Sequence, residues 1–395
     1  MSELIEKLSQ NSTKLAVFNA VRLRGKATAS EVESGVQSSK PTILKYLDEL
    51  VVEGLLAVDG KTKSSVGRPS KIFSVNASAA FAVGVDFGAP DLTFAMIDLA
   101  KNVVDRRQVS AALEEPPLSV ARKIIQGIEE MANANSVSLK EQMLGVGIGI
   151  PCWIDHRSEL ILPVPQLPHW ESVPLRTIME RAMDLPAYIR TGPRLMALGE
   201  RTFDGDDEKN MLYIHIRQSI GMGAYVDGML LRGSRWGASK LGHTIVCPDG
   251  PACICGKRGC LEVFASETAM VEKARELMNP EVTVQELFSA VRDEDTVARR
   301  VVGNALDYLA IAIINAIEFF DPELIVLGGN IAQCGDFVIR HLRRGIEELG
   351  LDLLNRSIEL RLSRLELYAG SLGAADLALE KACGMFPGRD ANIES

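Results

Sequence analysis

One short segment gathers a histidine and most of the cysteines of this chain, side chains of the kinds that bind transition metals. Four of the seven cysteines and one histidine lie between residues 243 and 260. Cys253, Cys255 and Cys260 form a C-x-C-x4-C array, and His243 precedes it by ten residues. Three thiolates and one imidazole are a ligand set that closes a tetrahedral shell around Zn²⁺. The spacing therefore predicts a structural zinc site.

The alternative for this segment is a loop with buried thiols or disulfides. Cys247 is the weakest candidate ligand, because a proline-containing turn separates it from the tight loop. Gly256 and Gly259 favour the metal, since glycine reaches the backbone angles that let a short loop fold back on an ion. Three further cysteines are scattered, have no catalytic partner nearby in the sequence, and are predicted to be small buried residues: Cys152, Cys334 and Cys383.

The cellular compartment bears on the same question. The N-terminus does not read as a signal peptide, and charges interrupt every apolar stretch of membrane-spanning length. We therefore expect the chain to stay in the reducing cytoplasm, with no membrane partner. Clustered thiols bind metal there rather than forming disulfides.

Composition predicts an ordinary globular chain with an uneven charge. A length of 395 residues corresponds to about two to three domains, and a hydrophobic content of 47% is ample for large cores. The formal net charge of -9 argues against coating nucleic acid along the whole chain. Residues 1–75 carry +3, however, so the remainder carries -12. This division indicates a small basic module attached to an acidic body.

The basic module has the pattern of a helix-turn-helix. Helices are expected at residues 14–24, 29–34 and about 37–53, the last with a serine cap and a proline in its first turn. Helical spacing turns four apolar residues of the third helix inward: Ile43, Leu44, Leu47 and Leu50. The polar face of this helix then lies in the position of a DNA-recognition helix.

A winged helix follows from the next segment. Residues 55–58 and 71–75 are expected to be short strands, joined by a polar loop at 59–70. An arginine at position 68 in this loop suits the narrow minor groove of DNA, while the alternative is a solvated turn without a partner. The predicted partner is a double-stranded DNA operator. The residues expected to contact it are Ser38, Ser39, Lys40, Thr42, Lys45 and Arg68.

The acidic body reads as α/β. Buried strands are expected at residues 81–88, 92–99, 144–151, 211–217, 223–226 and 324–329, with glycines in several of them. Residues 119–134 and 298–320 have helical periodicity. Alternating elements of this kind place ligands at glycine turns after the strands.

The chain resembles the ROK family, named for repressors, open reading frames and sugar kinases. Similar segments occur in family order at residues 83–88, 147–151, 167–170, 173–175, 197–200, 241–243, 260–262 and 321–329. The resemblance implies an N-terminal winged helix-turn-helix followed by a two-lobed, actin-like (ribonuclease H-like) ATPase-type body. The implied domains are residues 1–75, a first lobe at 76–195 joined by a C-terminal helix at 374–395, and a second lobe at 196–373 that contains the zinc loop 243–260.

The segments that serve phosphoryl transfer in ROK kinases are altered. The family's catalytic aspartate, in the segment Glu-Asn-Asp-Ala-Asn, is replaced by Gly192. Loss of a general base costs roughly two to four orders of magnitude in rate. Pro90 replaces a threonine in the phosphate turn and removes an N–H donor. Gly328 and Gly329 are kept, and we interpret them as close packing rather than nucleotide contact. No catalytic residue is therefore expected.

The resemblance implies a sugar pocket that is only partly kept. His243 and Glu262 match family residues that touch sugar hydroxyls, whereas Lys240 replaces a glutamate. Thr191 and Arg194 stand where the kinases have asparagines. Two added cations favour an anionic sugar derivative as the effector. The alternative is that Lys240 and Arg194 form ion pairs in a degenerate pocket.

These observations together predict a sugar-responsive transcriptional repressor of carbohydrate genes. It is expected to act as a homodimer or homotetramer, because one winged helix buries too little surface for specific DNA binding. The alternatives are an active sugar kinase with a DNA-binding head, and a scaffold regulated by a protein partner.

Overall fold

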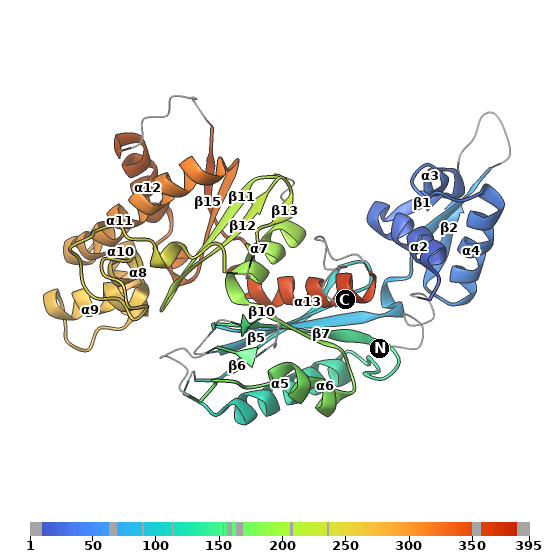
Figure 1. Ribbon diagram of the computed structural model, residues 1–395, viewed down its shortest axis with the longest axis horizontal. Coiled ribbons are helices and arrows are strands. Elements are labelled where there is room, and N and C mark those ends of the chain that lie inside the picture. Colours follow the sequence, from blue (N-terminus) through green and yellow to red (C-terminus); the bar gives the residue numbers. More distant parts are fainter. Residues whose placement is uncertain are drawn as a thin grey trace. The chain divides into compact units, whose positions relative to one another are not determined.

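The structure is a computed structural model of the chain (Figure 1). It describes residues 10–62, 69–88, 91–112, 114–152, 154–155, 160–162, 169–205, 208–234, 237–349 and 357–384. The chain divides into two compact units. The first unit comprises Met1–Gly192 and Gly370–Ser395, and the second comprises Pro193–Ala369.

The first unit begins with a winged helix-turn-helix, here called the head (residues 10–75). Its elements are α2 (Ser12–Arg24), β1 (Lys26–Thr28), α3 (Ala29–Glu33), α4 (Lys40–Val52), β2 (Leu56–Lys61) and β3 (Lys71–Val75). The strands form an antiparallel sheet in the order β1-β3-β2. The predicted helices and strands are confirmed with shifts of a few residues at their ends. The sequence missed β1, because three residues are too few to establish a period.

The core of the head follows from one face of α4. Ile43, Leu47 and Leu50 are fully buried, as predicted. The prediction that Leu44 faces inward is wrong, since its exposed fraction is 39%. Residues at i, i+4 and i+7 share one stripe of a helix, and a residue one position further lies about 100° around the axis. The buried face of α4 is therefore narrower than the number of its apolar residues indicates.

The rest of the first unit is built on a five-stranded mixed sheet in the order β10-β7-β4-β5-β6. Its strands are β4 (Phe81–Phe87), β5 (Asp91–Asp98), β6 (Val103–Ser110), β7 (Met143–Ile150) and β10 (Ala187–Thr191). β4 pairs antiparallel with β5 and parallel with β7. The other elements are η1 (Ala77–Ala79), α5 (Pro117–Ala134), β8 (Ile154–Asp155), β9 (Leu160–Ile161), α6 (Leu175–Met183) and α13 (Ala369–Ala382). The predicted helix at 374–395 thus begins earlier, and residues 385–395 lie outside the described part.

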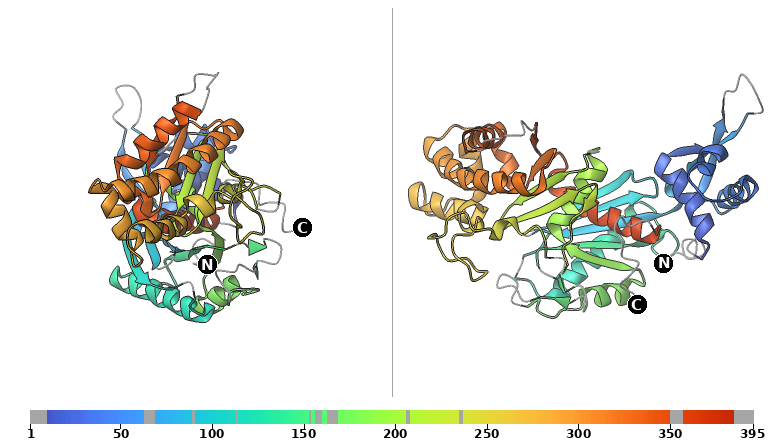
Figure 2. Two further views of the ribbon diagram at one scale, coloured as in Figure 1. Left: turned by 90° about the vertical axis from the view of Figure 1, so that its left-hand side faces the viewer. Right: turned by 45° about the horizontal axis from the view of Figure 1, so that its top comes forward.

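The two faces of this sheet are covered by different helices. α5 and α6 lie on one side and α13 on the other (Figure 1 and Figure 2). Val83 and Val85 contribute to the core under α5 and α6, while Gly84 between them faces α13. A Cβ atom at Gly84 or Gly147 would lie 1.9 Å from a carbonyl oxygen of α13. The backbones of the strands and the helix therefore approach closely at these glycines, where no side chain would fit.

The second unit repeats the strand order of the first. Numbered within each unit, both sheets run 3-2-1-4-5, with an antiparallel meander followed by parallel strands. The strands are β11 (Met211–Ile216), β12 (Ile220–Val226), β13 (Met229–Leu230), β14 (Leu324–Gly328) and β15 (Glu359–Leu362). The helices are α7 (Gly192–Phe203, which starts at the unit boundary), η2 (Leu241–His243), α8 (Glu262–Ala265), α9 (Glu267–Leu277), α10 (Val284–Arg292), α11 (Thr296–Phe320), η3 (Asn330–Cys334), α12 (Asp336–Leu349) and η4 (Glu366–Tyr368).

The longest helix of the second unit, α11, forms the centre of its core. Leu306, Leu309 and Ile313 are buried against the sheet and the neighbouring helices. Among the described residues, α11 is the single helix long and apolar enough to cross a membrane by length and composition, and 61% of its apolar window is buried in the protein. Asp307 and Glu318 interrupt the apolar sequence of this helix. Its packing is that of a core helix.

Candidate functional site

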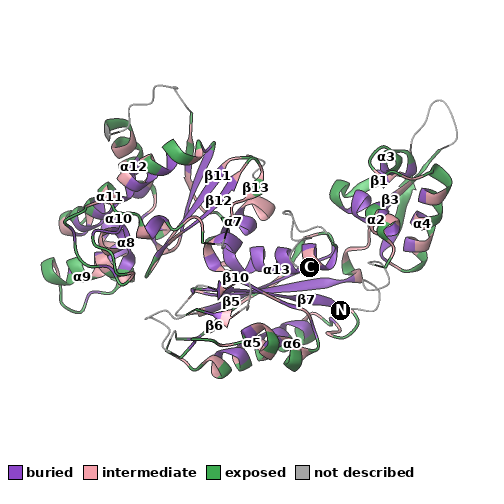
Figure 3. Ribbon diagram, viewed as in Figure 1, coloured by how far each residue is buried: buried purple, intermediate pink, exposed green. Residues whose placement is uncertain are grey.

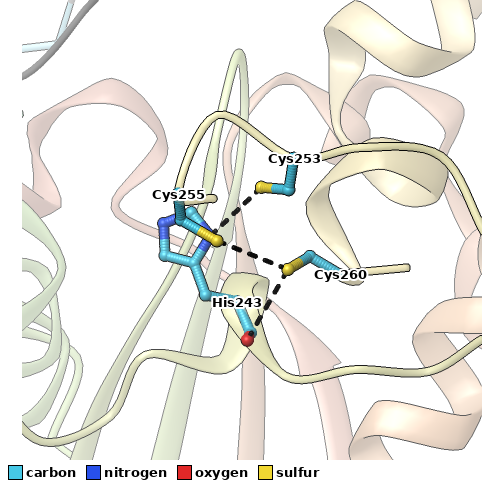
Figure 4. A group of neighbouring side chains, drawn as sticks. All are labelled: His243, Cys253, Cys255 and Cys260. Carbon is cyan, nitrogen blue, oxygen red and sulfur yellow. Dashed lines mark hydrogen bonds between the residues drawn. The ribbon is translucent and has the colours of Figure 1, made fainter. Parts of the chain in front are cut away.

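The structure brings the four predicted metal ligands together in the second unit. The ligand atoms of His243, Cys253, Cys255 and Cys260 all lie within 4.8 Å of one another (Figure 4). The Sγ atoms of Cys255 and Cys260 are 3.6 Å apart. Cys253 Sγ lies 3.7 Å from Nδ1 of His243. Cys247 is not a member of this group, in keeping with its rank as the weakest candidate.

The loop that carries the cysteines is folded by tight backbone contacts. Gly259 has a φ of +67°, and a Cβ atom there would lie 1.5 Å from the carbonyl oxygen of Cys247. Gly256 has a φ of +87°, which also favours glycine. Backbone bridges join Ile245 to Cys260. The predicted turns at the two glycines are confirmed, and they aim the cysteine side chains at one point.

The donor set and its spacing fit a tetrahedral metal ion. Around Zn²⁺, with bonds of about 2.3 Å to sulfur and 2.0–2.1 Å to nitrogen, two sulfurs lie roughly 3.8 Å apart and a sulfur and a nitrogen roughly 3.6 Å. The distances given above agree with both values. Burial, with the charges of Lys240 and Lys257, lowers the pKa of His243 and favours the neutral imidazole that binds metal. The cluster has the composition and geometry to hold a metal ion.

The other cysteines in the described part of the chain have a different character. Cys152, Cys334 and Cys383 have exposed fractions of 4%, 3% and 0%. Burial raises the pKa of Cys334 to about 12 and that of Cys383 to about 11, which keeps both as thiols at neutral pH. The prediction that these residues are buried is confirmed.

The residues predicted to bind an effector lie on several elements. Glu262 begins α8 beside the cluster, is 9% exposed, and accepts a hydrogen bond from the backbone N–H of Ile220 at 3.2 Å. Lys240 precedes η2, close enough to His243 to affect its pKa. Arg194 on α7 is buried and donates to the backbone oxygen of Arg232 at 3.1 Å. Thr191 is the last residue of β10, in the first unit.

Glu267 is a buried carboxyl group that the sequence analysis did not single out. It begins α9 and is 5% exposed. Its Oε2 accepts a 3.4 Å hydrogen bond from Asn330, and its Oε1 has no hydrogen-bond partner among the described residues. Burial raises the pKa of Glu267 to about 7, although the charge of Arg217 opposes this. Arg217 and Asn330 follow the parallel strands β11 and β14, so Glu267 lies at the strand-end turns where α/β proteins bind ligands.

We expect Glu267→Gln to stabilise the protein at alkaline pH. The pKa of Glu267 lies near 7 in the folded chain, against an ordinary value of 4.5. Below pH 4.5 this carboxyl group is protonated in both the folded and the unfolded chain. As the pH rises from 4.5 through 7, the unfolded chain loses the proton first, which lowers the free energy of unfolding by roughly 3 kcal/mol. The amide has no proton to lose, so the variant should gain up to about 3 kcal/mol over the parent between pH 4 and pH 8. Denaturant unfolding at both pH values measures this gain.

The comparison of variant with parent removes the effect of a second buried group. Burial and the charge of Arg217 lower the pKa of His215 to about 3, so its contribution is lost as the pH falls below 6.5. Both proteins contain His215, and its effect cancels in the difference. A difference that does not change with pH would show that folding does not raise the pKa of Glu267.

The predicted DNA-binding residues lie on and before α4. Ser39 is the N-cap residue, and its hydroxyl lies 2.8 Å from that of Thr42. The side chains of Lys40 and Lys45 are 52% and 68% exposed. Ser38 is half-buried in the turn before the helix. The arginine predicted at position 68, and the altered phosphate turn at 89–90, lie outside the described residues.

Comparisons with known proteins decide the family. The sequence profile of the ROK family matches residues 82–381, about three quarters of the chain. The chain belongs to the ROK family. The resemblance seen in the sequence is therefore confirmed, and the duplicated sheet is the body of a ROK protein. The head precedes the ROK match.

Relatives within the ROK family include regulators and kinases. The xylose repressor of Caldicellulosiruptor bescii is 25% identical over 386 residues, which cover 94% of this chain and 96% of the relative. The glucokinase of Halalkalibacterium halodurans is 28% identical and covers 78% of this chain and 98% of its own length. A solved ROK family transcriptional regulator, a homologue of the Escherichia coli MLC protein, has a TM-score of 0.77 at 24% identity and covers 96% of this chain and 97% of its own. The last match confirms the predicted fold class, head included.

Proposed function

We propose that this protein is a sugar-responsive transcriptional regulator, most simply a repressor, of carbohydrate genes in the cytoplasm. The observation that carries the proposal is the head, whose helix α4 presents exposed Lys40 and Lys45. The match to a xylose repressor extends over 94% of the chain and supports this function. The glucokinase match covers 78% of the chain. In this proposal the domains are those expected from the sequence: residues 1–75, 76–195 with the C-terminal helix, and 196–373.

DNA binding is assigned to the exposed face of α4 and to the wing. Lysines reach phosphates and release counterions, while polar side chains at the start of the helix reach base edges. The proposed contacts are Ser38, Ser39, Lys40, Thr42, Lys45 and Arg68. Two heads related by a twofold axis read two half-sites, so we propose a homodimer or homotetramer on a pseudo-palindromic operator.

The metal in the cluster is proposed to be Zn²⁺ with a structural role. All four coordination positions are filled by His243, Cys253, Cys255 and Cys260, which leaves no open position for Lewis-acid chemistry. A bound ion ties the loop 243–260 to the start of α8. Glu262, which begins that helix, is thereby held in place.

The effector is proposed to be a sugar or an anionic sugar derivative. Glu262 and His243 offer a carboxylate and an imidazole to hydroxyl groups, and Lys240 and Arg194 offer positive charge to an anion. Thr191 adds a hydroxyl. Titration calorimetry with D-xylose, D-glucose and glucose 6-phosphate tests the assignment. Binding of the neutral sugars without the phosphate ester would refute the anionic effector.

Sugar phosphorylation is the second candidate function, because a glucokinase is among the relatives. Two features argue against it. Gly192 occupies the position that matches the catalytic base of ROK kinases and cannot accept a proton. The buried carboxyl of Glu267 lies at the strand-end turns of β11 and β14, where phosphate could bind only while this carboxyl stays protonated.

In vitro selection of DNA by the full chain, followed by sequencing, tests the proposed function directly. We expect one enriched pseudo-palindromic sequence whose affinity changes when a sugar is added. A coupled assay with ATP and the same sugars is expected to give no phosphorylation above the background without protein. Rapid phosphorylation with no enriched DNA sequence would establish the kinase instead.

A further inference from the structure

A buried ion pair joins the two ends of the chain within the first unit. Arg22 on α2 of the head donates two hydrogen bonds of 2.9 Å to the carboxylate of Glu380 on α13. The side chains are 3% and 7% exposed. This two-pronged geometry fixes orientation as well as distance, because the planar guanidinium and the carboxylate must lie in register.

Further polar contacts surround the pair and balance its charge. Lys101, in the turn after β5, lies 2.6 Å from Asp376 and 2.7 Å from Glu380. Two cations thus meet two carboxylates. Asn19 on α2 donates to the backbone oxygen of Cys383 at 2.9 Å. Burial alone would raise the pKa of Glu380, but Arg22 and Lys101 hold it below its ordinary value, so the group is charged at neutral pH.

The helix that receives Arg22 is fixed firmly in the body. α13 packs on β4 and β7, where Gly84 and Gly147 admit its backbone, and nearly all of its residues are buried (Figure 3). The helix also begins where the chain returns from the second unit, at the Ala369–Gly370 boundary. The single helix α13 therefore extends from the point where the chain re-enters the first unit to the residues that contact the head.

The charged character of this contact needs an explanation beyond stability. A buried ion pair loses the hydration of both ions, and replacing it with well-packed apolar side chains is often neutral or stabilising. Its particular property is that it accepts a single geometry. Leucine or methionine side chains would hold the head in place equally well. A contact that sets the direction of α2 requires directional bonds.

We propose that Arg22 and Glu380 are positioning residues that orient the DNA-binding head on α13, so that a sugar-induced change in the body alters DNA affinity. The proposal rests on the proposed regulatory function and adds the route by which the response reaches the head. Arg22 does not belong to the DNA-binding residues assigned above. Breaking the pair should therefore remove the response to sugar and leave DNA binding itself largely intact.

The test uses the full-length double variant Arg22→Met/Glu380→Met, which replaces the ion pair with apolar side chains. Lys101 and Asp376 remain as a balanced pair in this variant. Lys14→Met is the matched control, since Lys14 forms ion pairs with Glu49 and Glu53 inside the head. DNA affinity is measured on a duplex selected by the unsubstituted chain, with and without D-xylose, D-glucose or glucose 6-phosphate. Hydrogen–deuterium exchange is followed in residues 12–24 and 369–384.

The double variant is expected to bind the duplex within about threefold of the parent without sugar. The sugar-dependent affinity ratio, typically ~5- to 150-fold for coupled sites, should fall below about 2. Exchange should become faster in both segments, while Lys14→Met should keep the parental ratio. An unchanged ratio or unchanged exchange in the double variant would overturn the proposal.

A parent chain that selects no DNA, or ignores every sugar tested, would instead contradict the proposed function. In that event the proposed role of Arg22 and Glu380 in the sugar response is also overturned. The exchange experiment then reports separately whether Arg22 and Glu380 fix the head to α13. The two failures are therefore distinguishable.

Discussion

Replacing Cys255 with Ser is expected to reduce the zinc content of the purified protein from about one ion per chain to a small fraction of that. A serine hydroxyl is a poor ligand for Zn²⁺, and the three remaining donors leave the tetrahedral shell open. Loss of a structural metal is among the few single changes that cost about 4 kcal/mol or more. For a unit of this size, the melting temperature should fall by roughly 8–16 °C. Atomic absorption and scanning calorimetry measure both effects.

Cys247→Ser is the matched control for this experiment. It removes a thiol from the same loop but not one of the four clustered ligands. We expect the control to retain its zinc and its melting temperature, and the Cys255 variant to lose the response to sugar with its metal. Unchanged zinc content and melting temperature in the Cys255 variant would rule out a structural site.

Replacing Lys40 and Lys45 with Ala is expected to weaken binding to the selected duplex by at least ~10-fold at low salt. Each lysine that neutralises a phosphate contributes to counterion release, so the slope of log affinity against log salt should shrink by about one for each lysine removed. The decrease in affinity should be nearly equal on selected and random duplexes, because phosphates carry no sequence information. Fluorescence anisotropy titrations at several salt concentrations measure the slope.

The control for the lysine variant changes the charge equally, but on the other unit. Lys209→Ala/Lys273→Ala removes two exposed lysines from the second unit. It should leave the slope unchanged. A parental slope in the Lys40/Lys45 variant would mean that α4 does not face the DNA backbone.

The sequence predicted those parts of the fold that are encoded locally. The serine cap and the proline of the third helix, with its periodic apolar residues, indicated the helices of the head, and buried apolar segments indicated the central strands. Leu44 was misplaced because composition does not reveal how wide a buried stripe is. The strands β10 and β15 were missed, since each is held by a neighbour far away in the sequence. β6 was missed for another reason: its side chains are exposed or half-buried, so it has no continuous apolar run.

The candidate site also has one part that is encoded locally and one part that depends on the folded chain. The cysteine spacing lies within one loop, so the cluster could be recognised from eighteen residues. Glu267 could not, because its perturbed pKa depends on burial and on Asn330, which is 63 residues away. A glutamate at the start of a helix is commonplace in sequence. Only the folded chain reveals that its carboxyl group has left water.

The ion pair between Arg22 and Glu380 imposes an order on biosynthesis. The two residues are 358 positions apart, close to opposite ends of the chain. At ~5–20 residues per second, a ribosome needs roughly 20–70 s to add Glu380 after Arg22 has been made. Throughout that interval the nascent head lacks its anchor. Only a chain translated almost to its end can assemble the oriented regulator, so prematurely terminated products would carry a head without a fixed direction.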